Sequence, residues 1–181
     1  MTRRAWISAI VAAALALLWS PRARAAEAEY QVKAEFMERF TRFIDWPATS
    51  FPKETDPFAV CLAGKHPFGD YLDKMAKARQ MKKRRMVVRA VTEPAQVDGC
   101  HILFIAGSEA KRLPQFLERT GSRPILTVGD TAGFGKQGIL INFYRDGENV
   151  RFEINVEAAT RSGLRFNSKL IRLGKLVGGR S

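Results

Sequence analysis

The sequence has little of the chemistry on which most enzymes and metal-binding modules depend. Its 181 residues contain two cysteines, Cys61 and Cys100, and two histidines, His66 and His101. Two cysteines exclude a disulfide-rich miniprotein and a zinc module with four cysteine ligands. The sequence contains neither a phosphate-binding Gly-Lys-Ser/Thr loop nor a Gly-x-Ser-x-Gly nucleophile elbow. After the first twenty residues no apolar run reaches the length of about 18 residues that a membrane span needs.

The composition is that of one globular, basic domain. Hydrophobic residues make up 46% of the chain and the formal net charge is +12. The chain is long enough to bury a core, and it contains no simple repeat or low-complexity tract.

The first 25 residues have the three parts of a secretory signal peptide. The pair Arg3-Arg4 precedes an almost wholly apolar run over residues 5–19, and Ala23-Arg24-Ala25 supplies a small-x-small cleavage pattern. We expect cleavage after Ala25 or Ala26, which leaves one mature domain over residues 26–181. The alternative is an N-terminal anchor helix, for which an apolar run of this length is short.

If the protein is exported, fewer classes of macromolecule are available for its basic surface to bind. The first 25 residues contain four arginines and no acidic residue, so their removal lowers the net charge from +12 to +8. A basic cytosolic domain suggests nucleic acid, but an exported one meets little of it. The expected partners are an anionic membrane surface or an acidic patch on another protein.

Export also bears on the two cysteines. In an oxidising compartment an even pair tends to form a disulfide, and a loop of about 40 residues closed by Cys61 and Cys100 stabilises the fold by roughly 3–4 kcal/mol. The alternative is a metal site formed by both cysteines, His66 and His101, although their spacing matches no familiar ligand pattern.

The order of apolar runs predicts an α/β fold. Strands are expected at 58–63, 85–91, 101–106 and 124–128, and helices at 31–46, 67–78 and 109–119. Strands at 139–144 and 149–154, joined through Asp146-Gly147, are expected to form a hairpin, followed by helices at 156–162 and 168–177. This order predicts a single doubly wound, Rossmann-like, mostly parallel sheet with a C-terminal antiparallel hairpin and flanking helices.

Two predicted helices have defined apolar faces. The helix over 31–46 places Val32, Phe36, Phe40, Phe43 and Ile44 on its inner face and Lys33, Glu35, Arg39 and Arg42 on its outer face. The helix over 168–177 places Leu170, Leu173 and Val177 inward.

Open α/β sheets bind ligands at the carboxyl ends of their strands. The candidate ligand or partner residues are therefore those in the loops after three predicted strands: Gly64, Lys65, His66, Ser108 and Asp130. A lone loop histidine is usually just solvated, and Asp130 could equally cap a helical turn, which is the role we favour.

Two other motifs are weaker. The segment 133–138 satisfies the Gly-x-Gly-x-x-Gly string, but its last glycine leads into a predicted strand, whereas a dinucleotide site needs a helix there. The run Lys82-Lys83-Arg84-Arg85 is the densest basic segment. Such a run is usually a solvated surface, and its functional interpretation is apposition to an anionic membrane or partner.

Several segments in order carry a family resemblance. They are 32–47 with its Phe40, Phe43, Trp46 and Pro47, then 60–69, 99–105, 125–134, 141–143 and 150–164. Together they resemble the YfiR family of periplasmic repressor proteins.

The resemblance implies a periplasmic homodimer that binds the periplasmic portion of an inner-membrane sensor with a cyclase or kinase output domain. That sensor is typically a diguanylate cyclase, so repression lowers cyclic di-GMP and restrains biofilm formation. The resemblance also pairs Cys61 with Cys100, while the second cysteine pair of some relatives is missing here. No enzymatic activity, cofactor or metal is expected. The alternative function is a periplasmic small-molecule sensor that uses the loops at the strand ends.

Overall fold

The structure is a computed structural model that describes residues 21–178. The strands are β1 Ile44–Asp45, β2 Phe58–Ala63, β3 Gln80–Met81, β4 Arg84–Val91, β5 Ile102–Ile105, β6 Leu126–Gly129, β7 Ile141–Asp146, β8 Asn149–Asn155, β9 Arg165–Phe166 and β10 Lys175–Val177. The helices are α2 Pro21–Phe40, α3 Tyr71–Ala78, α4 Leu113–Thr120, α5 Phe134–Gln137, α6 Val156–Arg161 and α7 Ser168–Leu173. Short 3-10 turns lie at η1 Ala48–Ser50, η2 Pro94–Val97 and η3 Gly107–Arg112.

Eight strands form the central sheet in the order β10-β8-β7-β6-β5-β2-β4-β3. The five strands from β4 to β7 pair in parallel, so their carboxyl ends meet at one edge of the sheet. β7 and β8 form the antiparallel hairpin, and β10 lies parallel to β8 at the sheet margin. The predicted mostly parallel sheet with a C-terminal hairpin is confirmed.

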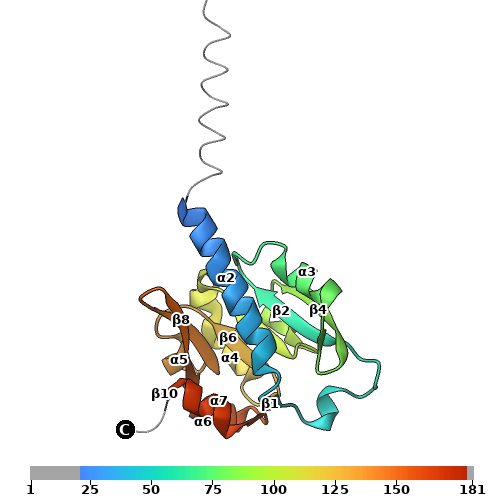
Figure 1. The fold of residues 1–181 in the computed structure, drawn as a ribbon. Helices are drawn as coiled ribbons and strands as arrows, with labels where there is room; N and C mark the ends of the chain where they lie inside the picture. Colours follow the sequence, from blue (N-terminus) through green and yellow to red (C-terminus); the bar gives the residue numbers. More distant parts are fainter. Residues whose placement is uncertain (1–20, 179–181) are drawn as a thin grey trace, which may run out of the picture.

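The helices cover the sheet on both faces because alternate strand side chains point to opposite sides. Along β2, Phe58, Val60 and Leu62 join the core under α2, α3, α6 and α7, while Ala59, Cys61 and Ala63 join the core under α4. Figure 1 shows α2 crossing one face of the sheet, with its first turns projecting beyond the body of the domain. None of the helices in residues 21–178 combines the length and apolar character needed to cross a membrane.

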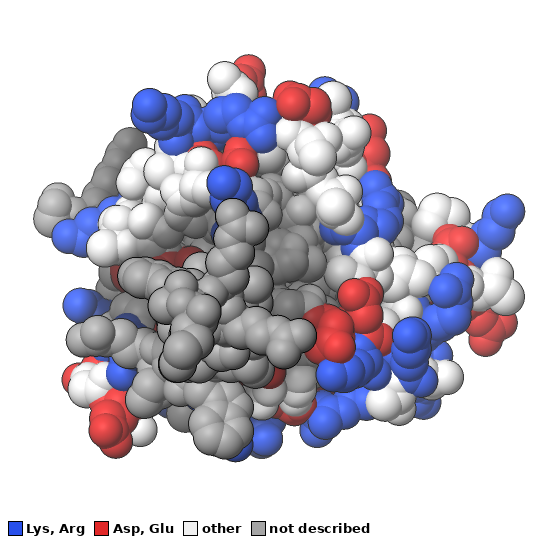
Figure 2. Space-filling view, turned by 90° about the horizontal axis from the view of Figure 1, so that it is seen from above, with Lys and Arg blue, Asp and Glu red and all other residues white. Residues whose placement is uncertain are grey.

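The predicted signal peptide, residues 1–25, lies outside the described residues except for its last five, which begin α2. Seen from the end at which α2 begins, the surface carries acidic side chains interspersed among the basic ones (Figure 2).

The helix predicted over 31–46 differs from α2 at both ends, since α2 already begins at Pro21. α2 stops at Phe40, and the backbone N–H groups of residues 41–43 then donate to the carbonyl oxygens three residues earlier, as in a turn. The buried Thr41 hydroxyl also donates to the Glu38 carbonyl oxygen at 2.6 Å. Ile44 and Asp45 then pair as β1 with β9, a tertiary contact that no local pattern reveals. The predicted faces are also partly wrong, since Val32 is 43% exposed and Lys33 is 4% exposed.

The helix predicted over 168–177 ends at Leu173, and residues 175–177 form β10 instead. At Gly174 the chain approaches β8 so closely that an added Cβ would lie 2.8 Å from Ile154 and 2.9 Å from Phe152. Strand pairing with β8 therefore overrides the helical pattern, and Leu173, expected inside, is 70% exposed.

Candidate functional site at the carboxyl edge of the sheet

Cys61 and Cys100 form a disulfide, as predicted. Cys61 lies on β2 and Cys100 precedes β5, the neighbouring strand, and their Cα atoms are 5.8 Å apart. The two residues are 0% and 4% exposed, within the core under α4. The bond uses both sulfur atoms that the alternative metal site would need. Within residues 21–178 no group of three or more His, Cys, Asp or Glu side chains is arranged to hold a metal ion.

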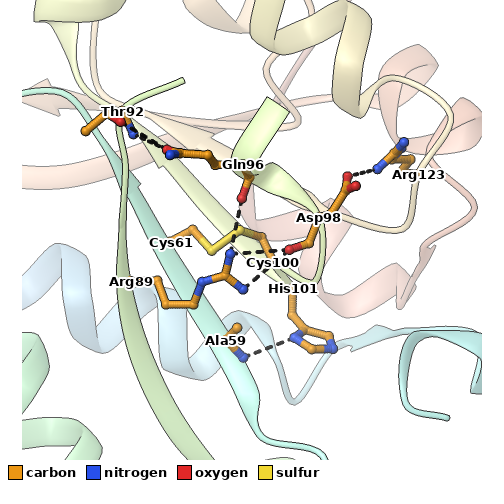
Figure 3. The surroundings of a disulfide bond; sticks show 9 residues. All are labelled: Ala59, Cys61, Arg89, Thr92, Gln96, Asp98, Cys100, His101 and Arg123. Carbon is orange, nitrogen blue, oxygen red and sulfur yellow. Dashed lines mark hydrogen bonds and ion pairs between the residues drawn. A yellow bond between two sulfur atoms is a disulfide. The ribbon is translucent and has the colours of Figure 1, made fainter. Parts of the chain in front are cut away.

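The loop that leads to Cys100 is fastened from outside by arginines (Figure 3). The Arg89 guanidinium donates to the carbonyl oxygens of Gln96 at 3.2 Å and Asp98 at 3.3 Å. The Asp98 carboxylate in turn accepts a hydrogen bond from Arg123. Because the disulfide is buried next to this loop, we expect the loop to protect it from reductants.

His101, which follows Cys100, links β2 to the segment around Ser50 through its imidazole ring. Its Nδ1 accepts the Ala59 backbone N–H at 3.0 Å, and its Nε2 lies 3.0 Å from the Ser50 carbonyl oxygen, to which it donates. The ring stacks on Phe51 with centroids 4.3 Å apart. This pattern requires the neutral imidazole, and burial lowers the pKa of His101 in the same sense.

The first two loops with candidate ligand residues contact each other. The Lys65 backbone N–H donates to the Ser108 hydroxyl at 2.8 Å, and a Cβ on Gly64 would lie 2.4 Å from the same oxygen. Gly64 has a φ of +84°, so glycine both permits the turn and leaves room for Ser108. Because β2 and β5 adjoin, this contact lies at the switch point where doubly wound sheets take ligands.

His66 lies in the first of these loops, beside Phe68. Its ring is 5.6 Å from that of Phe68, centroid to centroid, and burial lowers the pKa of the imidazole. In the described part of the chain its Nδ1 has no hydrogen-bond partner.

The third candidate loop is covered by α2. Lys33 Nζ lies 2.8 Å from the Asp130 carboxylate and 2.7 Å from that of Glu29, and the Tyr30 hydroxyl donates to Asp130. The Lys33 side chain is 5% exposed and that of Asp130 is 9% exposed. Burial, followed by the hydrogen bond to Asp130, raises the pKa of Tyr30.

These contacts correct two sequence-based expectations. Asp130 does not cap the following helix, because the N-cap of α5 is Gly133. Lys33, expected on the outer face of its helix, is the buried partner of Asp130. A Glu29–Lys33 pair at (i, i+4) is readable from the sequence, but the contact with a loop about one hundred positions away is not.

Residues 133–138 do not build a dinucleotide site. Between β6 and β7 they form only the N-cap glycine of α5, its four residues and the glycine that follows. A Cβ on Gly135 would lie 2.9 Å from the Glu153 carboxylate, so this glycine serves contact with β8.

Two of the four residues in the basic run 82–85 bond to other parts of the domain. Lys82 and Lys83 form the turn between β3 and β4 with φ values of 49° and 61°. Lys82 pairs with Asp45 at 3.2 Å, and Arg84 donates to carbonyl oxygens of the segment 53–56. Lys83 and Arg85 remain exposed.

Comparison with known protein families gives one match over most of the chain. A family model described as YfiR/HmsC-like matches residues 30–175. The match begins at Tyr30, the first residue of the α2 contact with Asp130, and ends at Lys175, the first residue of β10.

Proposed function

The chain belongs to the YfiR/HmsC-like family, and from this premise we propose that it is an exported regulator of a membrane signalling enzyme. It binds the periplasmic part of an inner-membrane protein with a cyclase or kinase output domain and holds that protein inactive. A diguanylate cyclase is the expected enzyme, so binding lowers cyclic di-GMP. The observation that carries the proposal is the family match over residues 30–175.

The arrangement at the strand ends supports a binding protein that works through its surface. At the carboxyl edge of the sheet, Tyr30 and Lys33 of α2 are bonded to Asp130, and Ser108 is bonded to Lys65. A metabolite that used Asp130 as a ligand would have to displace α2, whereas Lys65 and Ser108 are exposed. The alternative small-molecule sensor function therefore requires a movement of this helix at Asp130, and binding of a partner to the surface requires none.

Repression needs only a difference in affinity for two states of the target. If the receptor interconverts between active and inactive forms, a ligand that binds the inactive form more tightly shifts the population. About 5.5 kcal/mol of differential binding free energy moves such an equilibrium from 1:99 to 99:1.

Export belongs to the same proposal. We propose that residues 1–25 are removed during export and that residues 26–181 remain as one periplasmic domain, which associates as a homodimer. Arg24, Ala25 and Ala26 are exposed, so their removal takes no buried side chain from the described part of the domain. N-terminal sequencing of the periplasmic protein should begin at Ala26 or Glu27, and an uncut chain contradicts this part. Light scattering of the purified protein tests the homodimer, which a monomeric mass contradicts.

Deletion of the gene in the native host tests the regulatory role. We expect cyclic di-GMP to rise, the wild-type gene to restore the original level, and the tagged chain to co-purify with a membrane protein that carries a cyclase or kinase domain. The matched control is a chain without residues 1–25, which should fail to restore repression because it stays in the cytoplasm. Unchanged cyclic di-GMP after deletion, together with no such membrane protein in the purified material, contradicts the proposal.

A further inference from the structure

The C-terminal end of the domain exposes leucines among basic side chains. Leu173, the last residue of α7, is 70% exposed, and Leu176 in β10 is 55% exposed. They are the two most exposed of the large hydrophobic side chains in the described residues. Lys169 lies one helical turn before Leu173, and Arg172 directly precedes Leu173. Both basic residues are exposed.

Along the chain, the charge of the last described residues has one sign. After Glu157 the described residues contain five basic residues and no acidic one. Among residues 21–178 no acidic side chain forms an ion pair with Lys169 or Arg172, whereas Lys175 lies opposite Glu153 in the pairing of β10 with β8. The opposite end of the molecule, where α2 begins, carries both signs of charge (Figure 2).

We propose that Lys169, Arg172, Leu173 and Leu176 form a C-terminal docking surface for an anionic phospholipid bilayer. The leucine side chains enter the boundary between headgroups and acyl chains, and the basic side chains contact lipid phosphates. This proposal goes beyond the proposed function and does not rest on it.

The composition of the surface favours lipid over a protein partner. Protein interfaces are enriched in aromatic residues and arginine and depleted in lysine, and leucine is under-represented among their energetic hot spots. One of the two basic residues here is a lysine, both exposed apolar residues are leucines, and none of the four is aromatic. A protein partner would also need a pocket matched to each leucine, whereas the headgroup boundary accepts an apolar side chain of any shape.

The backbone limits how deeply the surface enters the bilayer. β10 is an edge strand, and in the described chain no strand pairs with its outer side. Unpaired backbone groups are costly in hydrocarbon, so β10 stays at the hydrated headgroup level and only side chains insert. Figure 1 places α7 and β10 at the end of the domain opposite to the start of α2, so docking directs the exposed turns of α2 away from the bilayer.

Sedimentation with lipid vesicles tests the proposal. The protein purified from the periplasm and its variants, all prepared in the same way, are mixed with vesicles of phosphatidylglycerol and phosphatidylcholine in equal parts, or of phosphatidylcholine alone. We expect binding to the anionic vesicles that weakens with added salt. The double variant Leu173→Ser/Leu176→Ser should bind roughly tenfold more weakly. Lys169→Gln/Arg172→Gln should lose about fivefold per basic residue.

Matched controls separate the surface from the overall charge. Lys77→Gln/Lys111→Gln removes two exposed lysines elsewhere, and Val32→Ser removes an exposed apolar side chain on α2. Both should bind vesicles within about twofold of wild type, because electrostatic attraction to the surface falls off within a Debye length. Because the altered side chains are exposed, thermal unfolding should not change.

Three results overturn the proposal. The first is wild-type protein that does not sediment with anionic vesicles. The second is control variants that lose as much binding as the variants of the docking surface. The third is a Leu173→Ser/Leu176→Ser protein that binds vesicles like wild type but loses capture of the membrane signalling protein, which would assign the surface to a protein partner.

Discussion

Loss of the Cys61–Cys100 bond should lower the free energy of unfolding by roughly 4 kcal/mol. The bond closes a loop over a sequence separation of 39 residues. In the chain-entropy model its removal raises the conformational entropy of the unfolded chain, and this gain in entropy accounts for the loss of stability. For a domain of this size a loss of 4 kcal/mol corresponds to a fall in Tm of roughly 8–16 °C. Both residues are buried, so their replacement also removes packed side chains from the core.

Urea denaturation followed by circular dichroism can separate the two contributions. Wild-type protein that is unfolded, reduced and refolded in reductant keeps both sulfur atoms and lacks only the bond. The decrease in its free energy of unfolding, relative to the oxidised protein, therefore measures the contribution of the cross-link. The variant Cys61→Ala/Cys100→Ala loses the bond and the packing, and it should be the less stable of the two. A third sample, native protein exposed to reductant without denaturant, should keep its bond much longer, because we expect the loop held by Arg89 to protect it.

The same proteins test whether the bond takes part in regulation. Our hypothesis is that breaking the bond loosens the repressor and releases the receptor, so the alanine variant should raise cyclic di-GMP in the host. Reduced and alanine proteins that unfold within about 1 kcal/mol of the oxidised wild type would refute the loop-closure argument. An alanine variant that is destabilised but represses like wild type would refute the switch alone.

Three further substitutions follow from contacts in the structure, each measured by urea denaturation. Lys33→Met should lower the free energy of unfolding by roughly 3 kcal/mol because it leaves Asp130 buried without its cation. The double variant Lys33→Met/Asp130→Asn should recover more than half of that loss. No recovery would contradict a paired role. Burial lowers the pKa of His101, so the unfolded chain binds its proton at higher pH than the folded chain does. The contribution of the neutral His101 ring to the free energy of unfolding should therefore reach its full value above about pH 6.5. Below that pH it should decrease by up to about 1.4 kcal/mol per pH unit. His101→Gln should remove this part of the pH dependence, and an unchanged slope would count against it. Gly174→Ala should lower the free energy of unfolding by about 1–3 kcal/mol, since the new Cβ would lie 2.8 Å from Ile154. An unchanged free energy of unfolding would show that β10 shifts freely.

The sequence by itself determined the fold class and the main strands. The apolar run 58–63 coincides with β2, and the Asp146-Gly147 signal lies in the β7–β8 hairpin, because burial of an apolar run and turn chemistry are both local properties. The disulfide was also predictable, since the expected compartment and the presence of only two cysteines leave one intramolecular pairing.

Only the tertiary structure decided what occupies the carboxyl edge of the sheet and what remains exposed. Asp130 follows a strand end in either interpretation, but its partners Tyr30 and Lys33 come from a helix about one hundred positions away. Leu173 fits a helical apolar face by its spacing, yet pairing of β10 with β8 ends the helix and turns this side chain outward. Periodicity describes an element in isolation, whereas the burial of each side chain depends on which surfaces the sheet leaves to be covered.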